Sequence, residues 1–110
     1  IDPSTTKNGC LEIANGNHNK GLIGEQWKPL EEDALDYVPI PTNSGDAIFF
    51  DSYAPHRSGP NMTDAKRRVL YVTYNAVSEG DHRRQYYADK RQNYPPDIER
   101  KPDTEYVFRV

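Results

Sequence analysis

The sequence of this 110-residue chain lacks several features that define large classes of protein. It has one cysteine, Cys10, which excludes an internal disulfide and fits a reducing, cytoplasmic compartment. It has no apolar run near the roughly 20 residues needed to span a bilayer, and no signal-like opening segment. It has no excess of positive charge, because the formal net charge is -3. We therefore expect neither nucleic acid nor a membrane as a partner.

The apolar residues that are present gather in short runs, between segments rich in charge, proline and tyrosine. This pattern suits strands joined by long loops better than a helical bundle. The length allows one domain, spanning residues 1–110. A short helix is expected near residues 81–92, ended by Pro95-Pro96. We expect a mainly β chain, part of a sandwich or barrel, with strands at 10–14, 37–41, 46–51, 67–77 and 105–110.

Some of these segments carry more specific expectations. The prolines of strand 37–41 suggest a sheet edge. Strand 46–51 is apolar on both faces, which favours a central strand covered on both sides. Alternation along strand 67–77 places Arg67 on the more polar face, as expected of a strand that lines a wet pocket. Residues 22–35, which include Trp27, are expected to form an excursion with room for one helical turn.

His56 and Arg67 are eleven positions apart and flank a turn between two apolar runs. Histidine is a common metal ligand, and two histidines with one carboxylate form the non-haem iron(II) pattern. A 2-oxoacid that chelates such an iron needs a charged partner for its far carboxylate. The planar fork of Arg67 fits that carboxylate, and the Ser58 hydroxyl can add a further hydrogen bond. Pro55 and Pro60 restrict the backbone around His56.

Other interpretations of these residues stay open. A histidine after an aromatic strand is often a core or turn residue, and an arginine that opens a strand is often a solvated charge. His18 and His82 lie in polar stretches that favour the surface. Asp51 is either a carboxylate ligand or a hydrogen-bonded cap. A basic cluster, most often a solvated helix face, could also close over an anionic substrate with Tyr86 or Tyr87; it consists of Arg83, Arg84, Lys90 and Arg91.

Four stretches follow one another within residues 1–77: Asn8-Gly9-Cys10-Leu11-Glu12-Ile13, Asn15-Gly16-Asn17-His18, Gly45-Asp46-Ala47-Ile48-Phe49-Phe50, and His56-Arg57-Ser58-Gly59-Pro60-Asn61 through Arg67. Together they resemble the phytanoyl-CoA dioxygenase family of iron(II)- and 2-oxoglutarate-dependent oxygenases. The resemblance implies a double-stranded β-helix, a cupin-like jelly roll. It also implies that His56 is the distal metal ligand, and that Arg67 binds the far carboxylate of 2-oxoglutarate with help from Ser58. Arg68 is the neighbouring alternative, on the other strand face.

Two departures from the family pattern stand out. The family's loop usually reads Pro-Gly-Ser-His, where this chain has Asn15-Gly16-Asn17-His18. The family's first metal motif, His-x-Asp, occurs nowhere in these residues. We therefore expect the chain, which opens at Ile1, to be the C-terminal part of a longer protein. It would supply one of three iron ligands and be inactive alone.

The tail, from Tyr86 through Arg109, is similar to family members that act on small aminophosphonates. The resemblance thus predicts hydroxylation of a small polar substrate, with phosphonates as one candidate class. Tyr71, Arg83 and Tyr87 are the candidate substrate residues. The alternatives are a jelly-roll or cupin-like binding module without redox chemistry, and an inactive fragment. The sequence does not identify the oligomeric state.

Overall fold

The structure, a computed structural model, describes residues 1–25 and 30–106. Within these residues the chain forms three strands and one α-helix: β1 (Leu11–Ile13), β2 (Val38–Ile40), β3 (His56–Ser58) and α1 (Arg83–Asn93). Short 3-10 turns lie at Thr6–Asn8, His18–Lys20, Val77–Glu79 and Asp97–Glu99. The chain divides into two compact units, residues 1–71 (unit 1) and 72–110 (unit 2). The expectation of one domain stays a prediction.

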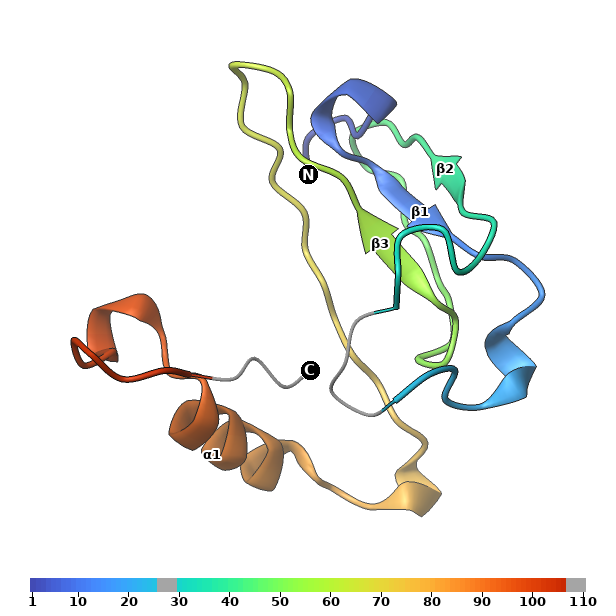
Figure 1. The fold of residues 1–110 in the computed structure, drawn as a ribbon. Coiled ribbons are helices and arrows are strands. Elements are labelled where there is room, and N and C mark those ends of the chain that lie inside the picture. Colours follow the sequence, from blue (N-terminus) through green and yellow to red (C-terminus); the bar gives the residue numbers. More distant parts are fainter. Residues whose placement is uncertain (26–29, 107–110) are drawn as a thin grey trace. The chain divides into compact units, whose positions relative to one another are not determined.

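The sheet of unit 1 is antiparallel, with β1 in the centre of the order β2-β1-β3 (Figure 1). Leu11 pairs with Ile40 on one side and with Ser58 on the other. Ile13 pairs in the same way with Val38 and His56. The antiparallel sheet and the single helix confirm, in this coarse form, the expected mainly non-helical chain with one short helix. The edge position of β2 also agrees with its proline content.

A small core lies on one face of this sheet. Leu11, Ile13 and Ala54 are its buried members, and Ile40 and Ile48 pack against them. Leu11 and Ile13 are two positions apart on β1, so their side chains point to the same face, while Glu12 between them points to the other. We call the face of Leu11 and Ile13 the inner face, and the face of Glu12 the outer face.

A tight turn precedes β1. The Thr5 side chain caps the 3-10 turn, and Gly9 ends it in the left-handed conformation at φ 76°. A Cβ atom at Gly9 would lie 2.2 Å from the carbonyl oxygen of Gly59. Only glycine fits both the conformation and this close approach between two segments. The turn leads through the buried Cys10 to the start of β1 at Leu11.

Two predicted strands are not formed within the part of the chain that the structure describes. Residues 46–51 form no strand, and the side chain of Phe49 is 89% exposed rather than covered on both sides. Residues 67–76 are extended but form no strand within the described part of the chain. Both runs have the composition of strands, but a strand also requires a neighbouring backbone to receive its hydrogen bonds. In contrast, β3 lies in a segment that the sequence indicated as a turn.

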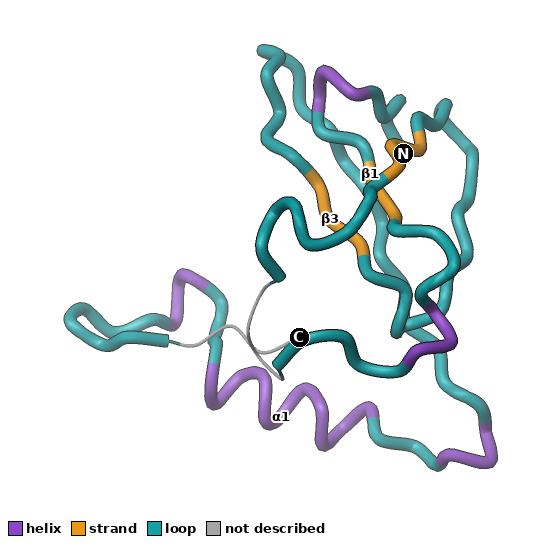
Figure 2. The backbone as a smooth tube through the Cα atoms, turned by 45° about the vertical axis from the view of Figure 1, so that its right-hand side comes forward, coloured by secondary structure: helices purple, strands orange, loops and turns teal. Residues whose placement is uncertain are grey.

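Helix α1, drawn in purple in Figure 2, consists mostly of polar residues and has no buried residue. The Asp81 carboxylate accepts a hydrogen bond from the backbone N–H of Arg83 at its start. Side-chain pairs one turn apart support the exposed helix, for example Gln85 with Asp89 at 2.8 Å. The helix ends at Asn93, two residues before Pro95-Pro96, as predicted.

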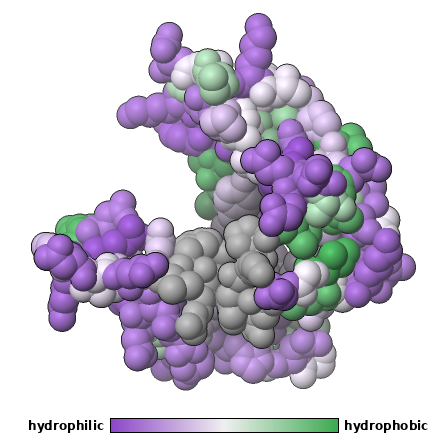
Figure 3. All heavy atoms as spheres, in the orientation of Figure 1, coloured by the Kyte–Doolittle hydropathy of each residue, from purple (hydrophilic) through white to green (hydrophobic). Residues whose placement is uncertain are grey.

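Some expectations fall wholly or largely outside the described residues. Trp27 lies there, as does most of the predicted strand 105–110. The described parts of the excursion, 22–25 and 30–35, contain no helix, but the backbone N–H of Ala34 donates to the carbonyl of Glu31 in a single turn. No helix in the described ranges has the length and apolar character to cross a bilayer. The face drawn in Figure 3 is mostly hydrophilic, with smaller apolar patches.

Candidate functional site

Two of the predicted site residues share the inner face of the sheet. His56 and Ser58 lie two positions apart on β3, so both side chains point to the same side. Their cross-strand partners are Ile13 and Leu11, whose side chains belong to the core. Yet His56 and Ser58 are exposed, whereas their partners are buried. His56 thus begins an exposed strand, and residues 46–51 before it are not the covered strand that the sequence predicted.

The ring of His56 is held in one orientation. Its Nδ1 atom lies 2.9 Å from the carbonyl oxygen of Ala54. Because a carbonyl only accepts, Nδ1 donates, and the neutral ring then carries its free lone pair on Nε2. The Phe50 ring packs against the imidazole at a centroid distance of 4.9 Å. This is the tautomer of a histidine that binds a metal through Nε2 while a backbone carbonyl orients it.

Arg67 reaches β3 from the run that follows the turn. Its Nη2 atom donates to the Oγ atom of Ser58 at 3.3 Å. Ser58 in turn donates its only hydroxyl proton to the carbonyl oxygen of Gly9 at 2.6 Å. The Nε atom of Arg67 is buried and has no hydrogen-bond partner in the described residues. A buried donor without a partner is costly, so this guanidinium is suited to an acceptor from outside the chain.

The neighbouring Arg68 is already paired. Its Nε and Nη2 atoms each lie 2.9 Å from one oxygen of the Asp2 carboxylate. Its backbone N–H also donates to that carboxylate. These hydrogen bonds from Arg68 lower the pKa of Asp2 from 3.8 to about 2. Of the two adjacent arginines, Arg67 is the one that the structure leaves available.

A cavity of about 390 Å³ opens beside the core of unit 1. Its lining is mostly apolar, with His18 and Asp51 among the polar members; the apolar lining includes Ile13, Ile40, Ile48, Phe49 and Phe50. The Asp51 carboxylate accepts a hydrogen bond from the backbone N–H of Tyr53 at 2.8 Å. That bond agrees with the cap role for Asp51. His18 is exposed, as its polar loop indicated.

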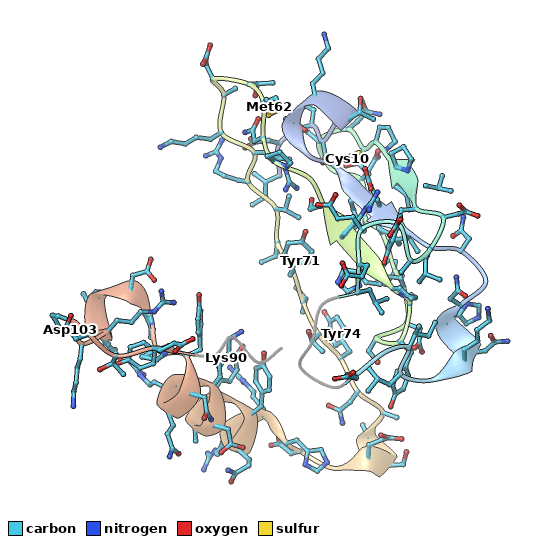
Figure 4. The ribbon with its side chains drawn as sticks, in the orientation of Figure 1. Cys10, Met62, Tyr71, Tyr74, Lys90 and Asp103 are labelled. Carbon is cyan, nitrogen blue, oxygen red and sulfur yellow. The ribbon has the colours of Figure 1, made fainter. Side chains whose placement is uncertain are left out.

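The predicted substrate residues belong to different parts of the chain. Tyr71 is 63% exposed on the extended run (Figure 4). Arg83 is exposed at the start of α1. Tyr87 lines a cavity of about 490 Å³ within unit 2, next to Arg91 and Arg100. Tyr71 thus belongs to unit 1, whereas Arg83 and Tyr87 belong to unit 2.

The arginines of the unit 2 cavity are paired with carboxylates. Arg91 bonds Glu99, and Arg100 bonds Asp97 at 2.7 Å. Arg100 also stacks over the Tyr94 ring at 4.1 Å. His82 is exposed, and its ring lies against the carbonyl of Glu79, so it is a surface residue of unit 2.

Within the described residues, no group of three or more His, Cys, Asp or Glu side chains is placed to share a metal. His56 is accordingly a single candidate ligand. Sequence reasoning missed three groups that arrange it and Ser58: the carbonyls of Ala54 and Gly9, and the ring of Phe50. The run Phe49-Phe50 was a visible signal for the last of these. The two carbonyls could not be identified from the sequence, because every residue has a backbone carbonyl.

Comparisons with known proteins agree with the resemblance. The family described as "Phytanoyl-CoA dioxygenase (PhyH)" matches residues 1–69. A methylphosphonate hydroxylase of Gimesia maris is 47% identical over 98 residues, 86% of this chain. A 2-aminoethylphosphonate dioxygenase of uncultured bacterium HF130_AEPn_1 is 39% identical over 111 residues, 96% of this chain. Dioxygenase lolE1 of Epichloe uncinata is 30% identical over 105 residues, 88% of this chain and 40% of its own length.

The chain spans only part of these relatives. It covers 38% of the length of the methylphosphonate hydroxylase and 42% of the 2-aminoethylphosphonate dioxygenase. No solved structure matches it.

Proposed function

The chain belongs to the phytanoyl-CoA dioxygenase (PhyH) family, and from that premise we propose that it is part of an iron(II)- and 2-oxoglutarate-dependent dioxygenase. The whole protein would hydroxylate a small polar substrate. Three relatives that match most of this chain are named as hydroxylases or dioxygenases, and this supports the reaction class. The observation that carries the proposal is the buried Nε atom of Arg67, which has no hydrogen-bond partner among the described residues. It lies beside Ser58, on the face that also presents His56.

His56 would be the metal ligand contributed by this chain. Its Nδ1 atom donates to Ala54, which leaves the Nε2 lone pair for the metal. The other two ligands, a His and an Asp in the family pattern, would come from elsewhere in the whole protein. Iron(II), when bound, would supply the activation of dioxygen. One imidazole holds iron(II) weakly, so the chain alone would be inactive.

Arg67 would bind the far carboxylate of 2-oxoglutarate. A guanidinium offers parallel N–H groups that fit a carboxylate, and the Nε atom of Arg67 still needs an acceptor. Ser58 would act mainly through Arg67, because its proton already goes to the carbonyl of Gly9. Its oxygen receives the Arg67 Nη2 hydrogen bond and so orients the fork toward the inner face.

A phosphonate is the substrate class that the relatives favour, since two of them are named for phosphonate substrates. Tyr71, Arg83 and Tyr87 remain the proposed substrate residues. Arg83 is the member of this set with a permanent positive charge for an anionic group. Tyr71 and Tyr87 offer hydroxyl donors to phosphonate oxygens.

The jelly roll belongs to the same proposal. The extended runs 46–51 and 67–76 have the residue types of strands. In the whole protein they would pair with further strands and close residues 1–110 into one domain around the inner face. The single, buried Cys10 supports a reducing, cytoplasmic location.

The test uses the whole protein with iron(II), 2-oxoglutarate and 2-aminoethylphosphonate or methylphosphonate. Succinate release coupled to a hydroxylated product is expected in the wild type. His56→Ala should reduce it at least about 100-fold, because a metal ligand matters no less than its outer-shell partners. His82→Ala, which removes an exposed histidine of unit 2, is the matched control and should leave turnover unchanged. Ligand binding without succinate release would instead indicate a binding module.

A further inference from the structure

On the outer face of the sheet, Arg57 makes three interactions at once. Its Nε atom donates to the Glu12 carboxylate at 2.6 Å, across 45 residues of sequence. Its Nη1 atom donates to the backbone carbonyl of Glu32 at 2.6 Å. Its guanidinium carbon lies 4.2 Å from the centre of the Tyr37 ring. We call Arg57, Glu12, Glu32 and Tyr37 the outer-face cluster.

This cluster lies directly behind the candidate site. Arg57 stands between His56 and Ser58 on β3, so its side chain points to the opposite face from theirs. Arg57 and Glu12 are cross-strand partners in the register of β1 and β3. The cluster therefore joins β3 both to β1 and to the segment 32–37.

The register of β3 is the property that this cluster can control. β3 has three residues, so its backbone ladder with β1 is short. A slip of one residue would turn His56 and Ser58 to the outer face and bring Arg57 to the inner one. In such a slipped register Arg57 would lose its ion pair with Glu12, and Ser58 would lose its hydrogen bond to the carbonyl of Gly9. The outer-face cluster thus opposes that slip from one side of the sheet, as Ser58 does from the other.

We propose that Arg57 is a positioning residue, which holds β3 in the register that presents His56 to the metal and Ser58 to Arg67. The inference rests on the proposed function. Arginine suits this role because its planar group donates in two directions while its face stacks on an aromatic ring. A lysine in its place has one compact charged group, so it would keep only some of the three interactions that Arg57 makes. Partial shielding supports the pair, since the Arg57 and Glu12 side chains are 42% and 27% exposed.

The experiment measures two dissociation constants in the whole protein: that of Mn(II), and that of 2-oxoglutarate with Mn(II) present. Arg57→Ala should raise both about tenfold, the lower end of outer-shell effects on metal sites. Arg57→Lys should fall between Arg57→Ala and the wild type. The double variant Arg57→Ala with Glu12→Gln should bind both ligands no more weakly than Arg57→Ala alone, because the two changes remove the same interaction between Arg57 and Glu12. Lys101→Ala, which removes an exposed cation of unit 2 outside the basic cluster, is the control and should bind as the wild type does.

A purely structural role predicts a different result. Arg57→Ala would then lower the unfolding midpoint while both dissociation constants stay within about twofold of the wild type, which would overturn the proposal. If Arg57→Ala does not fold, Arg57→Lys carries the test, since it keeps the charge and most of the volume. Wild-type affinity in that variant would overturn the proposal equally. A wild-type protein that binds neither Mn(II) nor 2-oxoglutarate would overturn the proposed function, and this inference with it.

Discussion

Ser58 and Gly9, 49 positions apart in sequence, are joined by a hydrogen bond of 2.6 Å from the serine hydroxyl to the glycine carbonyl. This bond connects the turn before β1 with the strand that carries His56. It also uses the only proton of the serine hydroxyl, so the Oγ atom can only accept any further hydrogen bond. Arg67 therefore meets the oxygen of Ser58 as an acceptor. The carbonyl of Gly9 thus fixes the orientation of the serine hydroxyl that Arg67 contacts.

We expect Gly9→Ala to destabilise the protein by about 2 kcal/mol or more, since it combines a left-handed backbone penalty with a steric overlap. The added Cβ would lie 2.2 Å from the carbonyl oxygen of Gly59. Gly16→Ala is the matched control, because Gly16 has φ 75° and nothing within 4 Å of its Cβ position. It should cost only about 1 kcal/mol. Urea unfolding measures both, and equal losses would show that the close approach carries no energy.

Arg67→Ala should weaken 2-oxoglutarate binding about 10- to 100-fold, the loss expected for about 1.5–3 kcal/mol of charge-assisted hydrogen bonding. Arg67→Lys should recover part of that loss, since it keeps the charge but not the fork. Arg68→Ala should leave the affinity near that of the wild type, because Arg68 is bound to Asp2. Titration of 2-oxoglutarate into the whole protein with Mn(II) measures all three. A larger effect of Arg68→Ala than of Arg67→Ala would reverse the assignment.

Ile13→Ala should destabilise the protein by about 2–4 kcal/mol, because it opens a space in the small core. Ile13 is 7% exposed, whereas its neighbour Val38 on β2 is 49% exposed. Val38→Ala is the control, and its cost should stay below about 1 kcal/mol. Chemical unfolding followed by circular dichroism provides the comparison. Similar costs at the two positions would contradict the burial of Ile13 in the core.

The carboxyl group of Asp2 should titrate with a midpoint of about 2, below its ordinary 3.8, because hydrogen bonds from Arg68 favour the charged form. With the folded pKa depressed, the pair contributes stability that is complete above the unfolded value near 3.8 and disappears as the pH falls through about 2. Carbon NMR of the labelled aspartate follows the titration. Arg68→Gln should move the midpoint back toward 3.8. A wild-type midpoint already near that value would refute the pairing.

Local pattern was sufficient for the elements whose causes are local. The sequence predicted a short strand at 10–14, which contains β1, and a short helix near 81–92 ended by Pro95-Pro96, which corresponds to α1. The runs 46–51 and 67–76 have equally strong strand composition, but composition does not supply a hydrogen-bonded neighbour. The prediction for β3 was wrong in the opposite sense, because a strand formed where a turn was expected. Its proline and glycine neighbours indicate a turn, while pairing with β1 makes it a strand.

The candidate site shows the same division. The sequence singled out His56, Ser58 and Arg67 by residue type and spacing, and the structure places Arg67 against Ser58. The role of Arg68 could not be read from the sequence, because its partner Asp2 lies 66 positions away. The tautomer of His56 could not be read either, since it depends on a backbone carbonyl.

The extended run 69–76 has a practical consequence for anyone who produces this chain by itself. Leu70 is 73% exposed and Tyr74 is 81% exposed, in a run that forms no strand within the described residues. Such a segment is a template for the same segment of another molecule. Concentrated solutions of the chain should therefore form β-rich assemblies with time. Dilute handling, or a charged residue in place of Leu70, should delay them.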